Sequence, residues 1–313
     1  FLKDNTKIGH DTRYKNIYQL ISNYCLDVND LKSERVFPRK KRKELTMKDA
    51  SKKLIPIFDN ILNQIQKKYT IFTSITAGYD SRLLMSITKK ISKNIQYYTF
   101  KLPDKSEKLV DYTLPKSICS DLDLNYRSIK IDVFDNKTKQ EIESIYDLPK
   151  LRPFQQYKNI FPKNKKPNIL LVGFVSEISK NYLERVKVIN GRDIVRALHS
   201  PDNKYLENYY QDWLNNNKKN IQKYGYEILD FIHWEQDITN FAGQNTYYAH
   251  HYVNLFSIFS SREIIKIMLS VNPNLRDGKN TIFFRFLIKK MWKELLNYPF
   301  NPTAKNKIIL ILK

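Results

Sequence analysis

The order of hydrophobic and polar positions along the chain separates short strands from longer helices. Runs rich in β-branched and aromatic residues, each with the length of a buried strand, cover 71–75, 95–100, 126–133 and 168–173. Apolar residues at helical spacing cover 46–69, 82–91, 105–121 and 136–147. Strands that alternate with helices predict a parallel sheet with helices on both faces. The expected fold class is therefore α/β.

The parts outside this alternating region have different patterns. Residues 1–45 are largely irregular, apart from a short predicted strand at Tyr24–Asp27. From about 203 to 298 the pattern is helical and rich in aromatic residues. Because the chain opens on Phe1 and not on Met, we expect a further region to precede it. The expected organisation is a lead-in of 1–45 and one domain of 46–313, with an α/β part over 46–200 and a helical part over 201–313.

Composition describes a folded globular protein. Hydrophobic residues make up 42% of the 313 residues and aromatic residues 13%, which supplies ample material for a core. No apolar run approaches the roughly 18 residues of a membrane helix, and no signal peptide opens the chain. The two cysteines, Cys25 and Cys119, belong to no motif, which is typical of a reduced setting. We expect a cytoplasmic protein with no membrane partner.

The formal net charge of +22 raises the question of a nucleic-acid partner. The basic residues are spread over the chain, and lysine, asparagine and isoleucine are abundant throughout, which indicates a general compositional bias. The densest basic run, 39–43, is short and is interpreted as an exposed linker. Nucleic acid is therefore not the expected partner, although the same positive field favours a polyanionic small molecule.

One strand-to-helix turn is the strongest candidate for chemistry. It follows the strand 71–75 and is built from small and polar residues. Such a turn directs backbone N–H groups and the positive end of a helix into one space, which suits a phosphate. Gly78 is expected to allow a close backbone approach or a positive φ. Thr76 and Ser81 add hydroxyl donors, and the acid Asp80 could hold magnesium. The same residues also suit an ordinary helix N-cap without a ligand.

The sequence of this turn, Thr-Ala-Gly-Tyr-Asp-Ser, resembles the pyrophosphate loop Ser-Gly-Gly-x-Asp-Ser of the N-type ATP pyrophosphatases (the PP-loop superfamily). Within that group it is similar to the synthetase domain of the asparagine synthetases, with threonine for the first serine and alanine for the first glycine. The resemblance implies an adenine nucleotide alpha hydrolase-like fold that binds ATP and Mg²⁺. The implied nucleotide-binding residues of the loop are Ile75, Thr76, Ala77, Gly78, Tyr79, Asp80 and Ser81.

Two further segments resemble motifs that complete the nucleotide site in this family. The run Tyr-Thr-Phe-Lys around Phe100 resembles the end of the second strand, where backbone groups meet the adenine. The run Val-Gly-Phe-Val-Ser-Glu-Ile, which contains Gly173 and Glu177, resembles the motif Gly-x-x-x-Glu, whose acid binds magnesium. The resemblance implies that Phe100 and Gly173 contact the nucleotide and that Asp80 and Glu177 hold Mg²⁺. It also implies catalytic roles for Asp80 and Lys279.

The C-terminal part resembles the closing segments of asparagine synthetase-related proteins, so that the resemblance spans roughly 10–302. The matching segments are 234–236, 259–264, 291–296 and 299–302. Two departures concern the catalytic centre. The glutamate that precedes the family's Arg-x-Pro-Phe-Leu-Asp signature falls on Val253, and the signature itself is reduced to Leu-Phe-Ser-Ile-Phe-Ser at 255–260. ATP binding is therefore better supported than amide synthesis.

The expected function is that of an asparagine synthetase-like, ATP-dependent ligase. It would adenylate a small-molecule or glycan-linked carboxylate, release pyrophosphate and form an amide with ammonia or glutamine-derived nitrogen. Two alternatives stay open: a tRNA-modifying PP-loop ATPase, and a catalytically inactive paralogue that acts as a binding or scaffold protein. A zinc site and a serine hydrolase are not supported, because the chain has no Cys/His cluster with zinc spacing and no Gly-x-Ser-x-Gly motif.

Overall fold

The chain forms two compact units. The helical unit comprises Phe1–Ala50, Val175–Asn245 and Arg262–Thr281, and the sheet unit comprises Ser51–Phe174, Thr246–Ser261 and Ile282–Lys313. Each unit draws on several separate stretches of sequence, and the expected domain boundaries at 45 and 200 stay predictions. The computed structural model describes residues 9–12, 14–101, 109–131, 133–145, 155–157, 166–180, 183, 187–276, 278 and 281–302.

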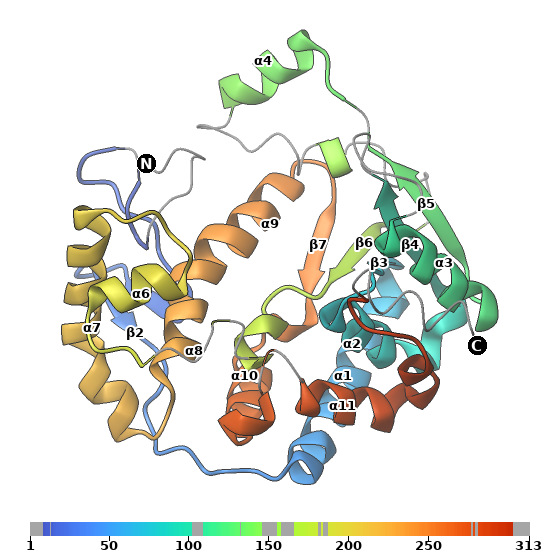
Figure 1. The fold of residues 1–313 in the computed structure, drawn as a ribbon. Helices are drawn as coiled ribbons and strands as arrows, with labels where there is room; N and C mark the ends of the chain where they lie inside the picture. The colour runs from blue at the N-terminus through green and yellow to red at the C-terminus, as the bar shows by residue number, and fades with distance from the viewer. Residues whose placement is uncertain are drawn as a thin grey trace. The chain divides into compact units, whose positions relative to one another are not determined.

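Within its described residues, the sheet unit contains five parallel strands (Figure 1). Their order across the sheet is β5 (Tyr126–Lys130), β4 (Ile95–Lys101), β3 (Thr70–Ser74), β6 (Asn168–Val172) and β7 (Asn254–Ser257). Phe72 of the central strand lies opposite Gln96 on one side and Leu170 on the other. The predicted parallel sheet is confirmed, and the four predicted strands are β3 to β6. The strand β7 lies in a region that was predicted to be helical.

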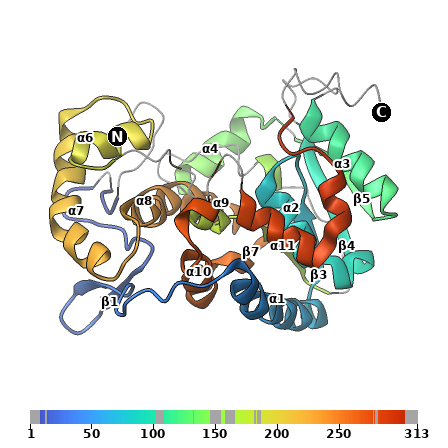
Figure 2. The same ribbon diagram turned by 60° about the horizontal axis from the view of Figure 1, so that its bottom comes forward.

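Helices cover both faces of the sheet (Figure 2). On one face, Phe72, Tyr98 and Leu170 pack with Ala249 in a buried apolar cluster. On the opposite face, the hydroxyl of Tyr97 forms a 2.7 Å hydrogen bond with Thr88, which directly follows α2. The helices of this unit and its borders are α1 (Met47–Lys68), α2 (Tyr79–Ile87), α3 (Val110–Asp121), α4 (Asn136–Ile145), α9 (Gln244–Ala249) and α11 (Ile282–Trp292).

The ends of two helices show how local hydrogen bonds set element bounds. Thr46 caps the N-terminus of α1, because the Asp49 N–H donates to Thr46 Oγ1 at 3.1 Å. The helix predicted over 82–91 is shorter, since α2 ends at Ile87 and a 3₁₀ turn, Lys89–Asn94, follows. Thr88 causes this break: its hydroxyl donates to the Met85 carbonyl at 2.7 Å and also meets Tyr97.

The helical unit combines helices with a small hairpin. The hairpin pairs β1 (Tyr24–Asp27) with β2 (Lys32–Arg35) in antiparallel register, and the sequence had predicted only its first strand. The helices are α6 (Gly191–Ala197), α7 (Lys204–Lys223), α8 (Ile228–Ile232), a π-helix (His233–Gly243) and α10 (Arg262–Leu269). Two 3₁₀ turns, Ser176–Lys180 and Pro273–Arg276, complete its described elements.

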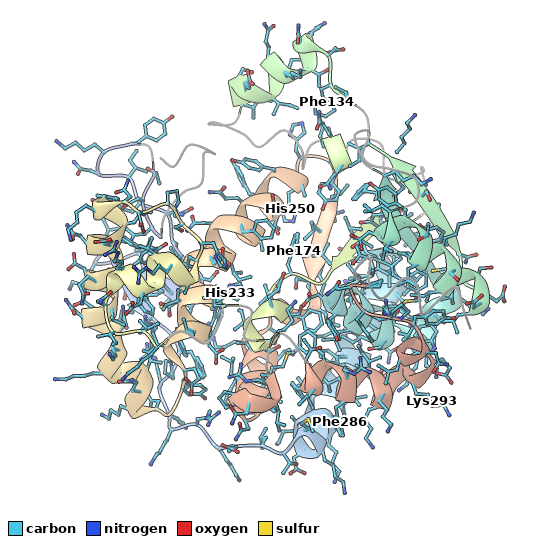
Figure 3. The ribbon with its side chains drawn as sticks, in the orientation of Figure 1. Phe134, Phe174, His233, His250, Phe286 and Lys293 are labelled. Atoms are coloured by element: carbon cyan, nitrogen blue, oxygen red, sulfur yellow. The ribbon has the colours of Figure 1, made fainter. Side chains whose placement is uncertain are left out.

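A buried carboxylate joins three elements of the helical unit. Glu235 of the π-helix is fully buried and accepts hydrogen bonds from Arg35 at 2.6 Å, Asn23 at 2.8 Å and Trp213 Nε1 at 3.1 Å. Burial raises the pKa of Glu235, and the Arg35 guanidinium opposes this shift. Nearby in the same helix, His233 Nδ1 lies 2.8 Å from the Asp237 carboxylate (Figure 3). The network therefore fastens the hairpin to α7 and the π-helix.

The structure also bears on the expectations for membrane helices and for the two cysteines. No helix among the described residues is long and apolar enough to span a bilayer. Cys25 is exposed, Cys119 is buried, and neither forms a disulfide. Burial raises the pKa of the Cys119 thiol to about 12. This cysteine is therefore a core residue and not a nucleophile.

Candidate functional site

The turn between β3 and α2 lies at the carboxyl end of the sheet, where the strand order reverses. After β3 the chain places β4 and β5 on one side and then returns to place β6 on the other. Open parallel sheets bind ligands at such a switch point, outside the carboxyl ends of the strands. The topology therefore puts the predicted loop at the position where this fold class forms its sites.

The first residue of the turn is held by the neighbouring strand. Ile75 is fully buried, and its N–H donates to the Tyr98 carbonyl at 2.9 Å. Its own carbonyl accepts a hydrogen bond from Thr99 Oγ1 at 2.7 Å. Because both bonds come from β4, the place where the loop leaves the sheet is set by that strand.

Two hydroxyl groups close the loop on itself. Thr76 Oγ1 lies 2.9 Å from Ser81 Oγ, and the Thr76 N–H donates to the same serine oxygen at 3.1 Å. Thr76 Oγ1 in turn accepts from the Gly78 N–H at 3.2 Å. These predicted donors therefore lie together, in a turn whose shape is fixed by their own hydrogen bonds.

A carboxylate already occupies one amide of the loop. The Ala77 N–H donates to Asp111 Oδ1 at 2.9 Å. Asp111 lies in the first turn of α3, where the helix dipole stabilises a negative charge. The loop thus receives an anionic oxygen at a backbone N–H, which is the kind of contact that a phosphate oxygen makes.

The next helix begins without a side-chain cap. Gly78 is the N-cap residue of α2, and as a glycine it has no side chain that could cap the helix. Its φ is −81°, so of the two expected roles, close backbone approach and a positive φ, only the first can apply. A Cβ here would lie 3.3 Å from Thr76 Oγ1 and 3.5 Å from Asn301 Oδ1. Glycine therefore serves close approach, and the first-turn amides of α2 are directed at the end of the sheet.

A buried arginine joins the loop to the C-terminal segment 295–301. Arg82 is fully buried and donates to the carbonyls of Pro299 at 2.9 Å, Tyr298 at 3.0 Å, Ala77 at 3.3 Å and Leu295 at 3.4 Å. Burial lowers the pKa of Arg82 to about 10, so the guanidinium stays charged at neutral pH. The Arg82 side chain therefore donates hydrogen bonds to carbonyl groups of two segments that lie far apart from each other in the sequence.

Aromatic contacts reinforce this connection. The rings of Tyr79 and Phe300 stack with centroids 4.2 Å apart and planes 7° apart. The Arg82 guanidinium lies 4.1 Å from the centre of the Phe300 ring, and the Arg285 guanidinium lies 5.2 Å from it. The Asn301 N–H donates to the Ala77 carbonyl at 3.0 Å. The segment around Phe300 thus forms one side of the loop.

The end of β6 reaches the loop as the sequence predicted. A Cβ on Gly173 would lie 3.4 Å from the Asp80 carbonyl oxygen, so the two backbones are in contact. Phe100, at the end of β4, is engaged with other rings, with centroids 5.0 Å from Tyr98 and 5.7 Å from Tyr157. Gly173 and Asp80 are therefore brought together, and the side chain of Phe100 packs into the core.

Two predicted site residues remain, Glu177 and Lys279. Glu177 belongs to the helical unit, two residues after Val175, which has φ of 76°. A positive φ at a β-branched residue is strained and is a feature of functional segments. Lys279 lies outside the described residues. The Asp80–Glu177 metal pair and the catalytic role of Lys279 stay predictions. Among the described residues there is no group of three or more His, Cys, Asp or Glu side chains placed to hold a metal ion.

Sequence reasoning missed the structural role of Arg82. An arginine inside the apolar stripe of a short helix is the signal that could have identified it, because a buried charge needs several partners. Three of its four carbonyl partners lie more than 200 residues away in the sequence, so no local pattern names them.

The chain has only low similarity to known proteins, in sequence and in structure. No protein-family model matches the chain, and no curated protein sequence matches it. Among solved structures, the glutamine-dependent NAD⁺ synthetase from Acinetobacter baumannii, in complex with ADP, is 16% identical, with a TM-score of 0.33, over 51% of this chain and 31% of that chain. An NH₃-dependent NAD synthetase from Campylobacter jejuni is 14% identical, with a TM-score of 0.30, over 76% of this chain and 96% of that chain. An NMN synthetase from Francisella tularensis is 13% identical, with a TM-score of 0.32, over 66% and 94% of the two chains. Fold and function are therefore argued from this chain's own residues.

Proposed function

We propose that this protein binds Mg-ATP at the loop 76–81 and uses it to adenylate a carboxylate, which an amine then converts to an amide. The observation that carries the proposal is the loop itself. It lies at the switch point of a parallel sheet, its Ala77 N–H receives a carboxylate oxygen, and the N-terminus of α2 has no side-chain cap. The switch point and the helix N-terminus favour an anionic ligand, whereas the Ala77 N–H is already occupied by Asp111.

The residues also suit a magnesium ion. Asp80, in the first turn of α2, and Glu177 offer carboxylate oxygens, the hard ligands that Mg²⁺ prefers. The resemblance assigns Mg²⁺ to these two acids, of which Asp80 belongs to the sheet unit and Glu177 to the helical unit. Thr76, Ser81 and the first-turn amides of α2 would orient the phosphates through hydrogen bonds. Lys279 would add a positive charge at the same group.

Nucleotide binding is tested by thermal unfolding. Mg-ATP at 100 times its Kd is expected to stabilise the protein by about 2.7 kcal/mol, because the loop exists only in the folded chain. Asp80→Ala is expected to abolish most of this rise in Tm. Asp123→Ala removes an exposed carboxylate of the same unit and serves as the matched control, with the full rise retained. An unchanged Tm of the wild-type protein at saturating Mg-ATP would remove the nucleotide assignment.

Catalysis is a separate question, because an inactive ATP-binding protein is the second candidate. Val253 favours it: this residue stands where the resemblance expects a glutamate, and it is buried in the apolar cluster with Phe72 and Leu170. Pyrophosphate release from ATP, measured with a panel of free carboxylates, distinguishes the two. An enzyme releases pyrophosphate in response to one of the carboxylates. A protein that binds ATP but releases none with any of them is the inactive paralogue.

A further inference from the structure

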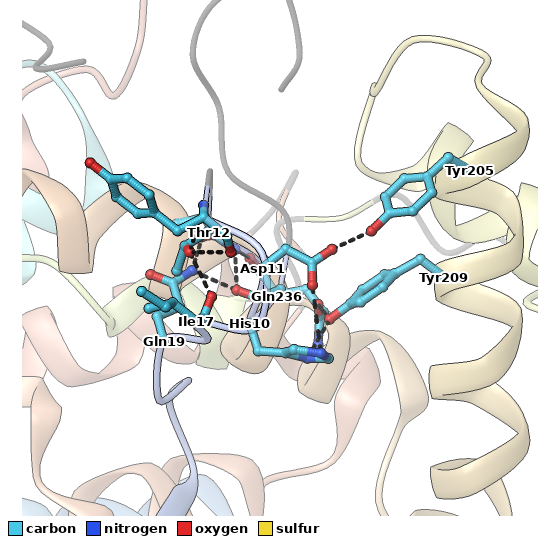
Figure 4. Close-up of polar contacts among 11 residues, drawn as sticks. His10, Asp11, Thr12, Ile17, Gln19, Tyr205, Tyr209 and Gln236 are labelled. Atoms are coloured by element: carbon cyan, nitrogen blue, oxygen red, sulfur yellow. Dashed lines mark hydrogen bonds and ion pairs between the residues drawn. The ribbon is translucent and has the colours of Figure 1, made fainter. Parts of the chain in front are cut away.

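Two acidic side chains of the helical unit are held by side-chain donors. Figure 4 shows one of them, Asp11, which accepts the hydroxyl hydrogen of Tyr205, and Glu235 accepts from a guanidinium. In the sheet unit Asp111 differs, because its hydrogen bond within the described part of the chain comes from a backbone group, the Ala77 N–H, at 2.9 Å. A backbone N–H of a strand-to-helix loop is a donor that a ligand anion can also use.

Three successive N–H groups of the loop have different kinds of partner. The Thr76 N–H donates to Ser81 Oγ at 3.1 Å, and the Gly78 N–H donates to Thr76 Oγ1 at 3.2 Å, so both bonds stay inside the loop. The Ala77 N–H lies between them and donates to a residue 34 positions away, in α3. Its partner can therefore be exchanged without opening the hydrogen bonds that close the loop.

Other contacts hold Ala77 in place. Its carbonyl accepts from the Asn301 N–H at 3.0 Å and from Arg82 Nη2 at 3.3 Å, and the residue is 2% exposed. The residue before it is held by Ser81, as described above. A scaffold role for Asp111 would therefore duplicate contacts that the loop already has.

Asp111 is held at the loop by little else. It is exposed, and neither an ion pair nor a second hydrogen bond joins it to another residue in the described ranges. It lies in the first turn of α3, where the helix dipole favours its charge. The carboxylate can leave the Ala77 N–H by a change of side-chain rotamer, with the loss of one charge-assisted hydrogen bond.

A phosphate oxygen and the Asp111 carboxylate compete for the Ala77 N–H. The N–H group has one hydrogen to donate, and two anions that approach it together repel each other. A ligand that binds at this N–H must therefore displace Asp111, and one that binds beside it meets the charge of the carboxylate. In both cases the carboxylate lowers the affinity of the loop for anions.

We propose that Asp111 is a specificity-determining residue of the loop: in the empty protein its carboxylate stands where a phosphate oxygen of the nucleotide binds, and it excludes anions that bring no cation. The Mg²⁺ of Mg-ATP offsets part of the phosphate charge, so that Mg-ATP is repelled less than a metal-free polyphosphate. This inference rests on the proposed binding of nucleotide at the loop. It gives α3 a part in the choice of ligand.

Titration calorimetry with Mg-ATP, and with inorganic pyrophosphate in EDTA, tests the role of this charge. Asp111→Asn is expected to bind pyrophosphate at least about fivefold more tightly than the wild type, because asparagine keeps the shape but not the charge. The gain with Mg-ATP should be smaller, and both gains should shrink in about 1 M salt. Glu143→Gln removes an exposed acid of α4 in the same unit and is the matched control, with both affinities unchanged.

A second variant separates competition from a scaffold role. If Asp111 competes with the ligand, Asp111→Ala binds both ligands at least as tightly as Asp111→Asn does. If Asp111 shapes the loop, Asp111→Ala binds Mg-ATP more weakly than the wild type and Asp111→Asn binds like the wild type, which overturns the proposal. Unchanged affinities in both variants, or an equal gain in Glu143→Gln, overturn it as well.

A spectroscopic measurement follows the Ala77 N–H directly. In protein labelled with ¹⁵N-alanine, the Ala77 amide resonance, assigned with Ala77→Gly, is expected to shift in Asp111→Asn and again when Mg-ATP saturates the wild type. A resonance that does not move at saturation shows that Asp111 is not displaced and overturns the proposal. Binding by the wild type without a gain in the Asp111 variants removes only the role of Asp111. If neither the wild type nor a variant binds Mg-ATP or pyrophosphate, the nucleotide assignment itself fails.

Discussion

Replacing Arg82 with alanine is expected to lower the free energy of unfolding of the sheet unit by about 3–5 kcal/mol. The guanidinium satisfies four carbonyl oxygens, and its loss leaves the buried carbonyls of Ala77 and Leu295 and the partly buried carbonyls of Tyr298 and Pro299 without this donor. The ring of Phe300 loses its cation at the same time. Urea unfolding, followed by circular dichroism and fluorescence, measures the change in free energy.

Two further variants identify the cause of that loss. Arg285→Ala removes the second cation near Phe300 from an exposed position and is expected to cost less than about 1 kcal/mol. Arg82→Lys keeps the charge but not the planar fork, so an intermediate loss is expected. Arg82→Ala should also reduce the stabilisation by Mg-ATP, because the segment that flanks the loop is released. A loss in Arg82→Ala no larger than in Arg285→Ala would show that the carbonyl contacts contribute little.

Breaking the buried ion pair of the helical unit is expected to have an effect of similar size. Asp230 and Arg276 are 2% and 1% exposed and form two hydrogen bonds of 2.7 and 3.1 Å. Asp230→Ala leaves an arginine charge buried without its carboxylate, at an expected cost of about 3–5 kcal/mol. Replacing both residues together, as Asp230→Leu with Arg276→Met, is expected to recover most of the loss. Urea unfolding of the single and double variants gives the coupling free energy.

An exposed pair provides the control for this cycle. Lys266 and Glu263 lie 3.6 Å apart on the surface of α10, and their removal is expected to change stability by less than about 1 kcal/mol. If the buried pair shows a coupling free energy as small as the exposed one, the buried charges are compensated by other groups. The expected loss in the free energy of unfolding on leaving the Arg276 charge without its carboxylate would then be wrong.

The outcome of the sequence predictions follows from how local each signal is. The strands β3 and β6 were predicted because both are short runs of buried, mainly apolar residues, and such runs form strands in many contexts. The strand β7 was missed, since Asn254–Ser257 has only four residues and follows a helical segment. Pairing with β6 makes it a strand, and that pairing joins residues more than 80 positions apart.

The candidate site also combines features that local sequence predicts with features that depend on distant residues. The loop 76–81 was predicted as a unit, because its small polar residues stand directly between a strand and a helix. The carboxylate of Asp111, 34 residues further along the chain, accepts the hydrogen bond of the Ala77 N–H, and no local pattern predicts this contact. Of the two roles expected for Gly78, close backbone approach is the one that applies, and its neighbour Asn301 comes from the far end of the chain.

The sequence by itself determined the parallel order of strands and helices, the strand-to-helix turn and its hydroxyl and carboxylate side chains. These are local properties, set by side-chain periodicity and turn chemistry over fewer than about 20 residues. The tertiary structure alone decided that Arg82 is buried against the segment 295–301 and that β7 extends the sheet. Each of those features depends on contacts between residues far apart in the sequence, where spacing carries no information about distance.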